Sequence, residues 1–223
     1  VPSRANIHGF KQLGVQYLIS VSAVGSLREE YVPGHVAIPD QLFDRTKGIR
    51  PASFFGEGLV VHVAFDQPFD HTLSDLLEQA AHTAGAVCHR GGTYTCMEGP
   101  QFSTLAESLE NRRAGFALIG MTALPEAKLA REAEIAYATL ALVTDYDCWH
   151  PHHDAVTVDS VVQVLKANAV LAQEIIRQVV PLIGGGFDSP AHHALATAII
   201  TDRAAITPAK RQQVALLVEK YLK

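Results

Sequence analysis

Two carboxylates spaced two positions apart, Asp145 and Asp147, are the residues of this chain best placed for acid–base chemistry. They follow an almost unbroken apolar run over residues 135–143, which is typical of a strand buried on both faces of a sheet. In open α/β sheets, ligands bind at the carboxyl ends of strands. In extended backbone the two side chains would project to one side, close enough to share a proton. The pattern therefore predicts an acid pair at a ligand crevice, with a pair of solvated turn aspartates as the alternative.

Strands and helices alternate along the sequence that must position these acids. This alternation predicts a three-layer α/β fold. The irregular segment 44–58 is of a length that often carries function in ordered proteins. The predicted strands cover residues 17–24, 36–38, 59–64, 86–97, 116–119 and 135–143, and the predicted helices cover 4–13, 71–84, 103–113, 125–134, 158–179, 192–200 and 208–222.

Composition narrows the class of protein. The 223 residues, 48% of them hydrophobic, suit one domain that buries about 70% of its unfolded surface. The net charge is −5 and no stripe of Lys and Arg occurs, which disfavours a nucleic-acid partner. No apolar run approaches eighteen residues, so we expect no membrane span. Three cysteines without a C-x-x-C motif indicate reduced thiols and a cytoplasmic location.

Five segments follow one another in a recognisable order: SVSAVGSLREE at 20–30, MEGPQF at 97–102, AES at 106–108, GMTALPE at 120–126 and TDYDCW at 144–149. Together they resemble the trimeric purine nucleoside phosphorylase family, most closely its branch that acts on 5′-methylthioadenosine. The resemblance, from about residue 4 to residue 180, implies a phosphorylase-type fold: a mostly parallel mixed central sheet flanked by helices. It also implies a homotrimer that uses inorganic phosphate as co-substrate, without a metal or other cofactor.

The reaction implied by this resemblance is phosphorolysis of S-methyl-5′-thioadenosine to adenine and 5-methylthioribose 1-phosphate, in purine and methionine salvage. The family begins with a strand, a Gly-rich phosphate loop and an Arg-His pair that are absent here, because Val1 lies just before the family's R-A-N-I helix. We therefore expect residues 1–223 to be a single, N-terminally incomplete nucleoside phosphorylase domain. Residues 184–223 would be its C-terminal helical tail.

The acid pair suits a 6-aminopurine. When the C1′–N9 bond breaks, a protonated carboxyl can stabilise the leaving purine at N7, and two neighbouring acids raise the pKa of one of them. Carboxylates also accept hydrogen bonds from a 6-amino group and repel a 6-oxo group, a mismatch that can cost about 10⁴ in selectivity. Asp145 and Asp147 are therefore the expected catalytic residues.

The resemblance assigns the other site residues. Phe102 would stack on the purine, Ser103 would orient a carboxylate, and Glu98 would support the site. From the residues alone, Phe102 and Met121 could instead be core, and Ser103 and Thr122 helix N-caps. The full expected set is Met121, Phe102, Ser103, Tyr146, Glu98, Val158, Val161, Val162 and His62 for the substrate, with His62 donated by a neighbouring subunit, and Ser22, Ala23 and Thr122 for phosphate.

Three other functions remain open from the sequence. A broader phosphorylase for 6-oxopurines would more naturally carry Asn at the base-reading position. The missing phosphate loop would fit a non-catalytic nucleoside-binding remnant. The histidines at 150, 152 and 153 with Asp154 could bind zinc, but their spacing is irregular and no second cluster supplies a fourth ligand. A surface loop rich in histidine is the better interpretation.

Overall fold

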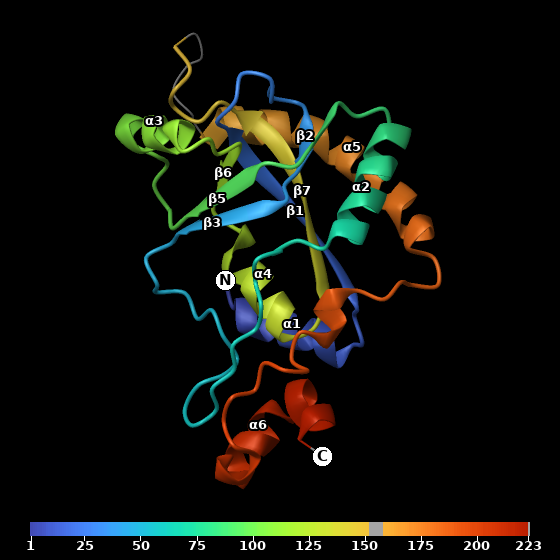
Figure 1. Ribbon diagram of the computed structural model, residues 1–223. Helices are drawn as coiled ribbons and strands as arrows, with labels where there is room; N and C mark the ends of the chain where they lie inside the picture. The colour runs from blue at the N-terminus through green and yellow to red at the C-terminus, as the bar shows by residue number, and fades with distance from the viewer. Residues whose placement is uncertain (152–157, 223) are drawn as a thin grey trace.

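The computed structural model describes residues 1–151 and 158–222, apart from the side chains at 158, 160, 161, 163, 165 and 167. Within these residues, seven strands form one sheet in the order β3-β5-β6-β1-β7-β2-β4. Neighbouring strands are parallel except at β1–β6 and β2–β7, so the predicted mostly parallel mixed sheet is confirmed (Figure 1). The strands are β1 (Tyr17–Ser26), β2 (Val36–Ile38), β3 (Gln41–Arg45), β4 (Cys88–Arg90), β5 (Thr93–Met97), β6 (Leu118–Gly120) and β7 (Ala136–Asp145).

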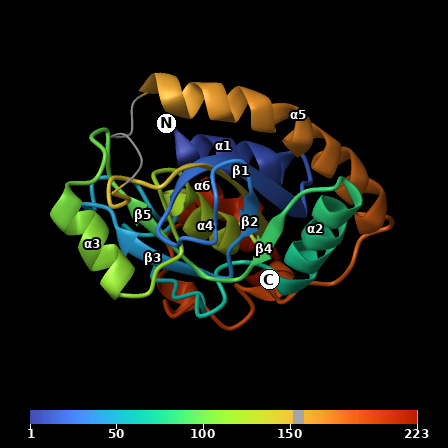
Figure 2. The same ribbon diagram turned by 90° about the horizontal axis from the view of Figure 1, so that it is seen from above.

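Helices cover both faces of this sheet, which confirms the three-layer architecture (Figures 1 and 2). Helices α2 (His71–Thr83) and α5 (Val158–Ile183) lie against one face. Helix α4 (Ala123–Glu132), with α1 (Ser3–Gln12) packed on it, lies against the other. Helix α3 (Leu105–Arg113) lies beside the part of the sheet that carries β3 and β5, and α6 (Pro208–Val218) contacts α1.

Strand β7 is buried on both sides because its side chains alternate between two apolar cores. Leu140 and Leu142 pack with α2 and α5, whereas Tyr137, Ala141 and Val143 pack with α1 and α4. This is the arrangement that the unbroken apolar run predicts. The last residue of the strand, Asp145, therefore lies where β7 leaves the two apolar cores.

Some predicted elements differ in the structure. Residues 59–64 alternate like a strand, but they form only isolated bridges, Leu59 with Gly56 and Val61 with Ile199, because no neighbouring strand is available to continue a ladder. The predicted strand 86–97 is divided into β4 and β5 at Gly91 and Gly92, which both have positive φ. The predicted helix 192–200 is reduced to a 3₁₀ turn at Pro190–His193 followed by irregular turns. Strand β3 was not predicted.

The segment after residue 183 is tied to the rest of the chain by polar contacts. The Tyr17 hydroxyl accepts a hydrogen bond of 2.6 Å from the Phe187 amide, and Ser189 Oγ donates to the Asp70 carboxylate. Glu134, only 3% exposed, lies 2.6 Å from Lys220 Nζ and accepts from the Tyr221 hydroxyl at 2.5 Å. These contacts hold the C-terminal turns and α6 against the body of the molecule.

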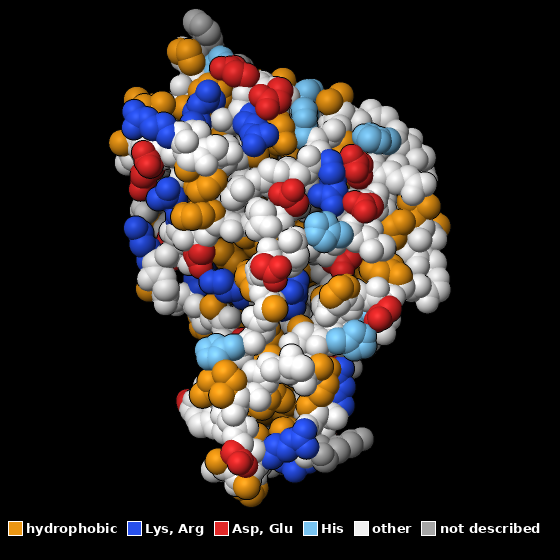
Figure 3. All heavy atoms as spheres, in the orientation of Figure 1, with side chains coloured by type: hydrophobic (Ala, Val, Ile, Leu, Met, Phe, Trp, Pro, Cys, Tyr) orange, Lys and Arg blue, Asp and Glu red, His pale blue; other side chains and the backbone are white. Residues whose placement is uncertain are grey.

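Basic and acidic side chains are interspersed on the face shown in Figure 3, with apolar side chains between them. None of the described helices combines the length and the apolar character needed to cross a membrane. Cys88, Cys96 and Cys148 are all free thiols in the structure.

Candidate active site

The acid pair lies at the carboxyl end of β7. Asp145 is the last residue of the strand, and its carboxylate accepts hydrogen bonds from the Thr144 hydroxyl at 2.7 Å and from the Asp147 amide at 2.8 Å. Asp147 has φ +52°, the left-handed conformation, so the expected extended backbone across the pair is wrong. The turn brings the Asp147 amide back onto the first carboxylate, and the two acids share one corner of the site.

Burial, rather than mutual repulsion, dominates the titration of these acids. It raises the pKa of Asp147, while the Ser108 and Ser103 hydroxyls oppose the rise. It also raises the pKa of Asp145, to which the charge of Asp147 adds only a smaller rise. Asp147 is 8% exposed, and no donor among the described residues reaches its Oδ2 atom. A buried carboxylate oxygen without a hydrogen-bond partner disfavours the charged form of the acid.

Gly25, near the end of β1, makes this close arrangement possible. A Cβ atom there would lie 2.9 Å from Asp145 Oδ1, 3.0 Å from Ile119 Cγ2 and 3.3 Å from the Asp147 amide. Residue 25 pairs with both Asp145 and Ile119 across the sheet. A side chain at this position would displace the acid pair.

A second polar group lies three residues earlier on β1. Ser22 Oγ and Thr122 Oγ1 are 2.7 Å apart, although Ser22 belongs to β1 and Thr122 lies between β6 and α4. Thr122 occupies the N-cap position of α4, but its side chain makes no capping hydrogen bond, so the alternative role of helix cap is wrong. The exposed Thr122 hydroxyl is instead paired with Ser22, whose hydroxyl also donates to the Ala23 carbonyl at 3.3 Å.

A cavity of about 760 Å³ opens beside Thr122. Met121, Thr122, Glu98 and Glu126 line it, together with the start of α1 and the segment around Arg50. Burial raises the pKa of Glu126, while the hydroxyls of Tyr137 and Ser20 oppose the rise. The cavity thus combines polar and apolar walls next to the Ser22–Thr122 pair.

The predicted purine wall consists of the segment before α3. Phe102 is 44% exposed, so the alternative of a core role for this ring is wrong. Ser103 is not the helix cap: Thr104 caps α3, in a capping box with Glu107. The Ser103 carbonyl lies 3.4 Å from Cys148 Sγ, which places this segment against the acid turn. Both predicted residues are therefore free of the structural roles proposed as alternatives.

Glu98 is engaged by Arg50, a residue that sequence reasoning did not single out. Arg50 Nε lies 2.7 Å from Glu98 Oε1, and this hydrogen bond lowers the pKa of Glu98, assisted by the Lys47 amide. Arg50 Nη1 also donates to the carbonyls of Met121 and Leu124, at 2.6 and 2.5 Å. The only sequence signal for Arg50 was its position in the long irregular segment.

Two other predicted residues lie apart from this cluster. Tyr146 is 6% exposed, packs edge-on against Trp149 at 5.6 Å and donates to the Glu29 carbonyl, so its ring supports the acid turn from behind. His62 is exposed in the segment before α2, where its amide donates to the Ala198 carbonyl. The contacts named for these two residues are with Trp149, Glu29 and Ala198 rather than with the two carboxylates.

Most of the residues predicted to form the 5′ pocket have side chains outside the described part of the chain. The side chains of Val158 and Val161 lie outside the described residues, and Val162 is 37% exposed at the start of α5. Residues 152–154 of the histidine cluster also lie outside them, while His150 pairs with Glu29 at 3.1 Å. Within the described part of the chain, no group of three His, Cys, Asp or Glu residues could hold a metal ion.

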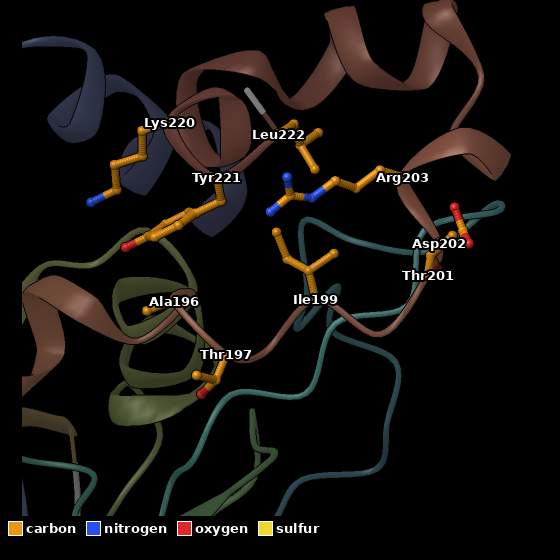
Figure 4. Close-up of a pocket in the computed structure, with 9 residues that line it drawn as sticks. All are labelled: Ala196, Thr197, Ile199, Thr201, Asp202, Arg203, Lys220, Tyr221 and Leu222. Carbon is orange, nitrogen blue, oxygen red and sulfur yellow. The ribbon is translucent and has the colours of Figure 1, made fainter.

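A second cavity, of about 550 Å³, lies at the C-terminal segment, where none of the predicted site residues lines it (Figure 4). Arg203 extends between Ile199 and Leu222 in this view. Lys220, at its edge, is paired with Glu134. The chemistry predicted from the sequence therefore belongs to the first cluster, at β1, β6 and β7.

That cluster has two ends along β1. The acid pair lies beside Gly25 and the hydroxyl pair lies at Ser22, which a strand places roughly 10 Å apart. Met121 lines the same cavity as Thr122, and its Sδ atom lies 2.5 Å from the position that a Cβ on Gly99 would take.

Comparison with known proteins identifies the class that this fold and site define. Residues 1–181 match the phosphorylase superfamily, and the chain belongs to that family. The crystal structure of a methylthioadenosine phosphorylase from an Antarctic soil metagenomic library has a TM-score of 0.92 and 50% identity, covering 97% of this chain and 77% of that one. A methylthioadenosine phosphorylase from Schistosoma mansoni, solved in complex with adenine, has a TM-score of 0.80 and 30% identity, with coverage of 97% and 77%.

Two curated relatives carry the name of one particular enzyme. The S-methyl-5′-thioadenosine phosphorylase of Chloroflexus aurantiacus is 65% identical over 99% of this chain and 77% of its own length. The enzyme of the same name from Geobacter sulfurreducens is 54% identical over 98% of this chain and 77% of its own length. The chain thus spans about three quarters of the length of these relatives.

Proposed function

We propose that this protein catalyses the phosphorolysis of S-methyl-5′-thioadenosine to adenine and 5-methylthioribose 1-phosphate. The observation that carries the proposal is the Asp147 carboxyl, buried beside Asp145 with Oδ2 unengaged by any described donor. Relatives 54% and 65% identical to the chain carry the name of this activity. An acid held in this way at the end of a central strand suits protonation of a leaving purine.

In the proposed reaction, a phosphate oxygen attacks C1′ and the C1′–N9 bond breaks, with its electron pair moving into the purine. Burial raises the pKa of Asp147 and so favours its protonated form; this acid gives its proton to N7, and the proton released by the phosphate returns to it through solvent. Asp145 is held as an acceptor by Thr144 and by the Asp147 amide. It would receive a hydrogen bond from the 6-amino group.

The remaining assignments follow the length of the site. Inorganic phosphate is bound by Ser22, Ala23 and Thr122, and the sugar lies over Met121. Phe102 and Ser103 contact the purine, while Glu98 and Tyr146 support these contacts. The 5′-methylthio group lies against Val158, Val161 and Val162. We infer a cytoplasmic homotrimer in which His62 reaches the site of a neighbouring subunit, and a single domain that includes the tail from residue 184.

The proposal predicts that Asp147→Asn selectively impairs reactions of 6-aminopurines. An amide cannot supply the proton to N7, so kcat/KM for S-methyl-5′-thioadenosine should fall about 10²- to 10⁴-fold. The amide can donate to a 6-oxo group, so the ratio of activity on adenosine to activity on inosine should fall as well. Steady-state kinetics with the three nucleosides, in the presence of phosphate, measures both effects.

Asp75→Asn is the matched control, because Asp75 is exposed and only forms a surface ion pair with Arg90. It should retain both the activity and the preference for the 6-amino group. An Asp147→Asn variant with an unchanged adenosine-to-inosine ratio would contradict the assignment of Asp147. Absence of phosphate-dependent turnover by the unmodified chain would contradict the proposed function as a whole.

A further inference from the structure

Tyr94 in β5 carries a polar group without an obvious purpose. Its side chain is fully buried, and its hydroxyl has no hydrogen-bond partner of good geometry among the described residues. Most buried tyrosine hydroxyls find a partner, because an unpaired polar atom in the interior is unfavourable. The position of this hydroxyl therefore needs an explanation.

Gly120 leaves the space that Tyr94 occupies. A Cβ atom on Gly120 would lie 2.1 Å from the Tyr94 hydroxyl oxygen and 2.7 Å from Cζ, so any other residue at 120 would collide with the ring end. Strands β5 and β6 are paired in parallel at this point, with Cys96 opposite Gly120. The small residue thus lets a long side chain reach through the end of β6.

The hydroxyl that passes through this gap lies near the Ser22–Thr122 pair, without a hydrogen bond of good geometry to either oxygen. Burial raises the pKa of Tyr94, and the Ser22 and Thr122 hydroxyls lie close enough to oppose that rise. These two hydroxyls are themselves 2.7 Å apart, and Thr122 faces the large cavity. Three hydroxyl groups from β5, β1 and the start of α4 therefore meet at one end of the site.

We infer that Tyr94 is a positioning residue for phosphate: when phosphate is bound, it donates its hydrogen to the Ser22–Thr122 pair and so directs the hydrogen of that pair toward the anion. This inference rests on the proposed function, which places phosphate at these two residues. It concerns a residue of this chain that neither the sequence motifs nor the proposed reaction require.

The count of hydrogens explains why a third hydroxyl matters. In a bonded Ser22–Thr122 pair, one hydroxyl hydrogen is used between the two oxygens, and the direction of that bond is not fixed. When Tyr94 donates to Ser22, the single Ser22 hydrogen turns from the Ala23 carbonyl, to which it donates at 3.3 Å in this structure, to Thr122, and the Thr122 hydrogen is left for a phosphate oxygen. Ser22 and Thr122 then each accept one hydrogen bond and donate one, and such chains strengthen their last donor.

Tyr94→Phe is the test, because it removes the hydroxyl oxygen and keeps the ring. We expect the KM for phosphate to rise at least about fivefold, while the KM for the nucleoside stays within about twofold, since hydrogen bonds to charged groups are the stronger ones. Equal changes in both KM values, or no change in either, would overturn the inference. Circular dichroism and the unfolding midpoint establish that the variant is folded.

Two further variants keep the result interpretable. Tyr31→Phe removes a hydroxyl that lies 3.5 Å from the Gly91 carbonyl, away from the site, and should leave both KM values unchanged. Gly120→Ala should displace the Tyr94 hydroxyl and reproduce the phosphate-specific defect. If it leaves phosphate KM unchanged while it folds normally, the inference fails.

The proposed function and this inference can fail separately. If the unmodified protein shows no turnover, calorimetric titration with inorganic phosphate alone compares it with the Tyr94→Phe protein. Weaker phosphate binding by the variant would support the role of Tyr94 even though the reaction was wrongly assigned. Equal affinities, or no binding by either protein, would overturn it.

Discussion

Arg50 shows how one side chain can set the geometry of a whole site. Its guanidinium group donates to the carbonyl oxygens of Met121 and Leu124 and to that of Glu98, in addition to its ion pair with the Glu98 carboxylate. It therefore joins the segment before the purine wall to the segment between β6 and α4. Several donors in one rigid plane are a property of arginine that lysine lacks.

Arg50→Lys should accordingly misplace both segments. Because displacements of about 1 Å in a site can reduce rates about 10²-fold, we expect a loss of that order in kcat/KM for the nucleoside. The loss of activity should occur in a protein that is still folded at the assay temperature, which thermal denaturation measures. Arg211→Lys, at an exposed ion pair with Glu219, is the control and should retain full activity. Wild-type kinetics in the Arg50→Lys protein would exclude this positioning role.

At the scale of single residues, the sequence predicts which acids form the pair, but it does not predict the backbone geometry that brings them together. Their position after an apolar strand identified Asp145 and Asp147 as a candidate pair, but the left-handed backbone at Asp147 depends on a turn that no local pattern specified. The contacts of Arg50 and Tyr94 join segments that are distant in sequence. Such contacts arise only when the sheet has formed, so periodicity and spacing do not reveal them.

Among the elements, the C-terminal segment depends on one buried carboxylate at the end of α4. Glu134 follows the α4 C-cap with φ +55° and accepts hydrogen bonds from the Leu195 amide and the Tyr221 hydroxyl, besides its pairing with Lys220. Three of the last forty residues, from two separate segments, thus meet at a single side chain. This contact couples α6 to the central sheet through α4.

Glu134→Ala should release this segment. A buried Leu195 amide would lose its acceptor, which destabilises a protein by about 1–3 kcal/mol. We therefore expect faster cleavage by trypsin within residues 184–222, together with a lower unfolding midpoint. Glu110→Ala, at an exposed ion pair on α3, serves as control. Identical proteolysis of the Glu134→Ala and unmodified proteins would contradict this account.

The elements that the sequence predicts well are those fixed by their own pattern. Strand β2 matches its predicted range of 36–38, and β7 differs from its predicted run by one or two residues. Strand β3 was missed because Gln41–Arg45 is a polar edge strand, stabilised by pairing with β5 rather than by an apolar face. Residues 59–64 were wrongly predicted as a strand because alternation alone does not supply a partner.

For the whole molecule, the two apolar cores on either side of β7 should unfold together. Leu140 lies in the core with α2 and α5, and Leu129 lies in the core with α1 and α4. Replacing either residue by alanine should destabilise the protein by about 2–5 kcal/mol. Because both cores share one strand, each substitution should lower the midpoint of the same single unfolding transition, measured by calorimetry.

Two separate transitions, with only one affected by each substitution, would show that the faces fold independently. Val170→Ala, at a position on α5 that is 70% exposed, should change the midpoint little. A single transition would also support the proposal that the chain, including the tail from residue 184, is one domain.

The alternation along β7 has a consequence for length as well as for composition. Removing or adding one residue between Ala136 and Val143 would exchange the faces to which the following side chains point, because the repeat of a strand is two residues. The leucines would then meet the wrong helices, and the terminal aspartate would turn away from Gly25. Indels in this strand are thus excluded by packing and by chemistry at once.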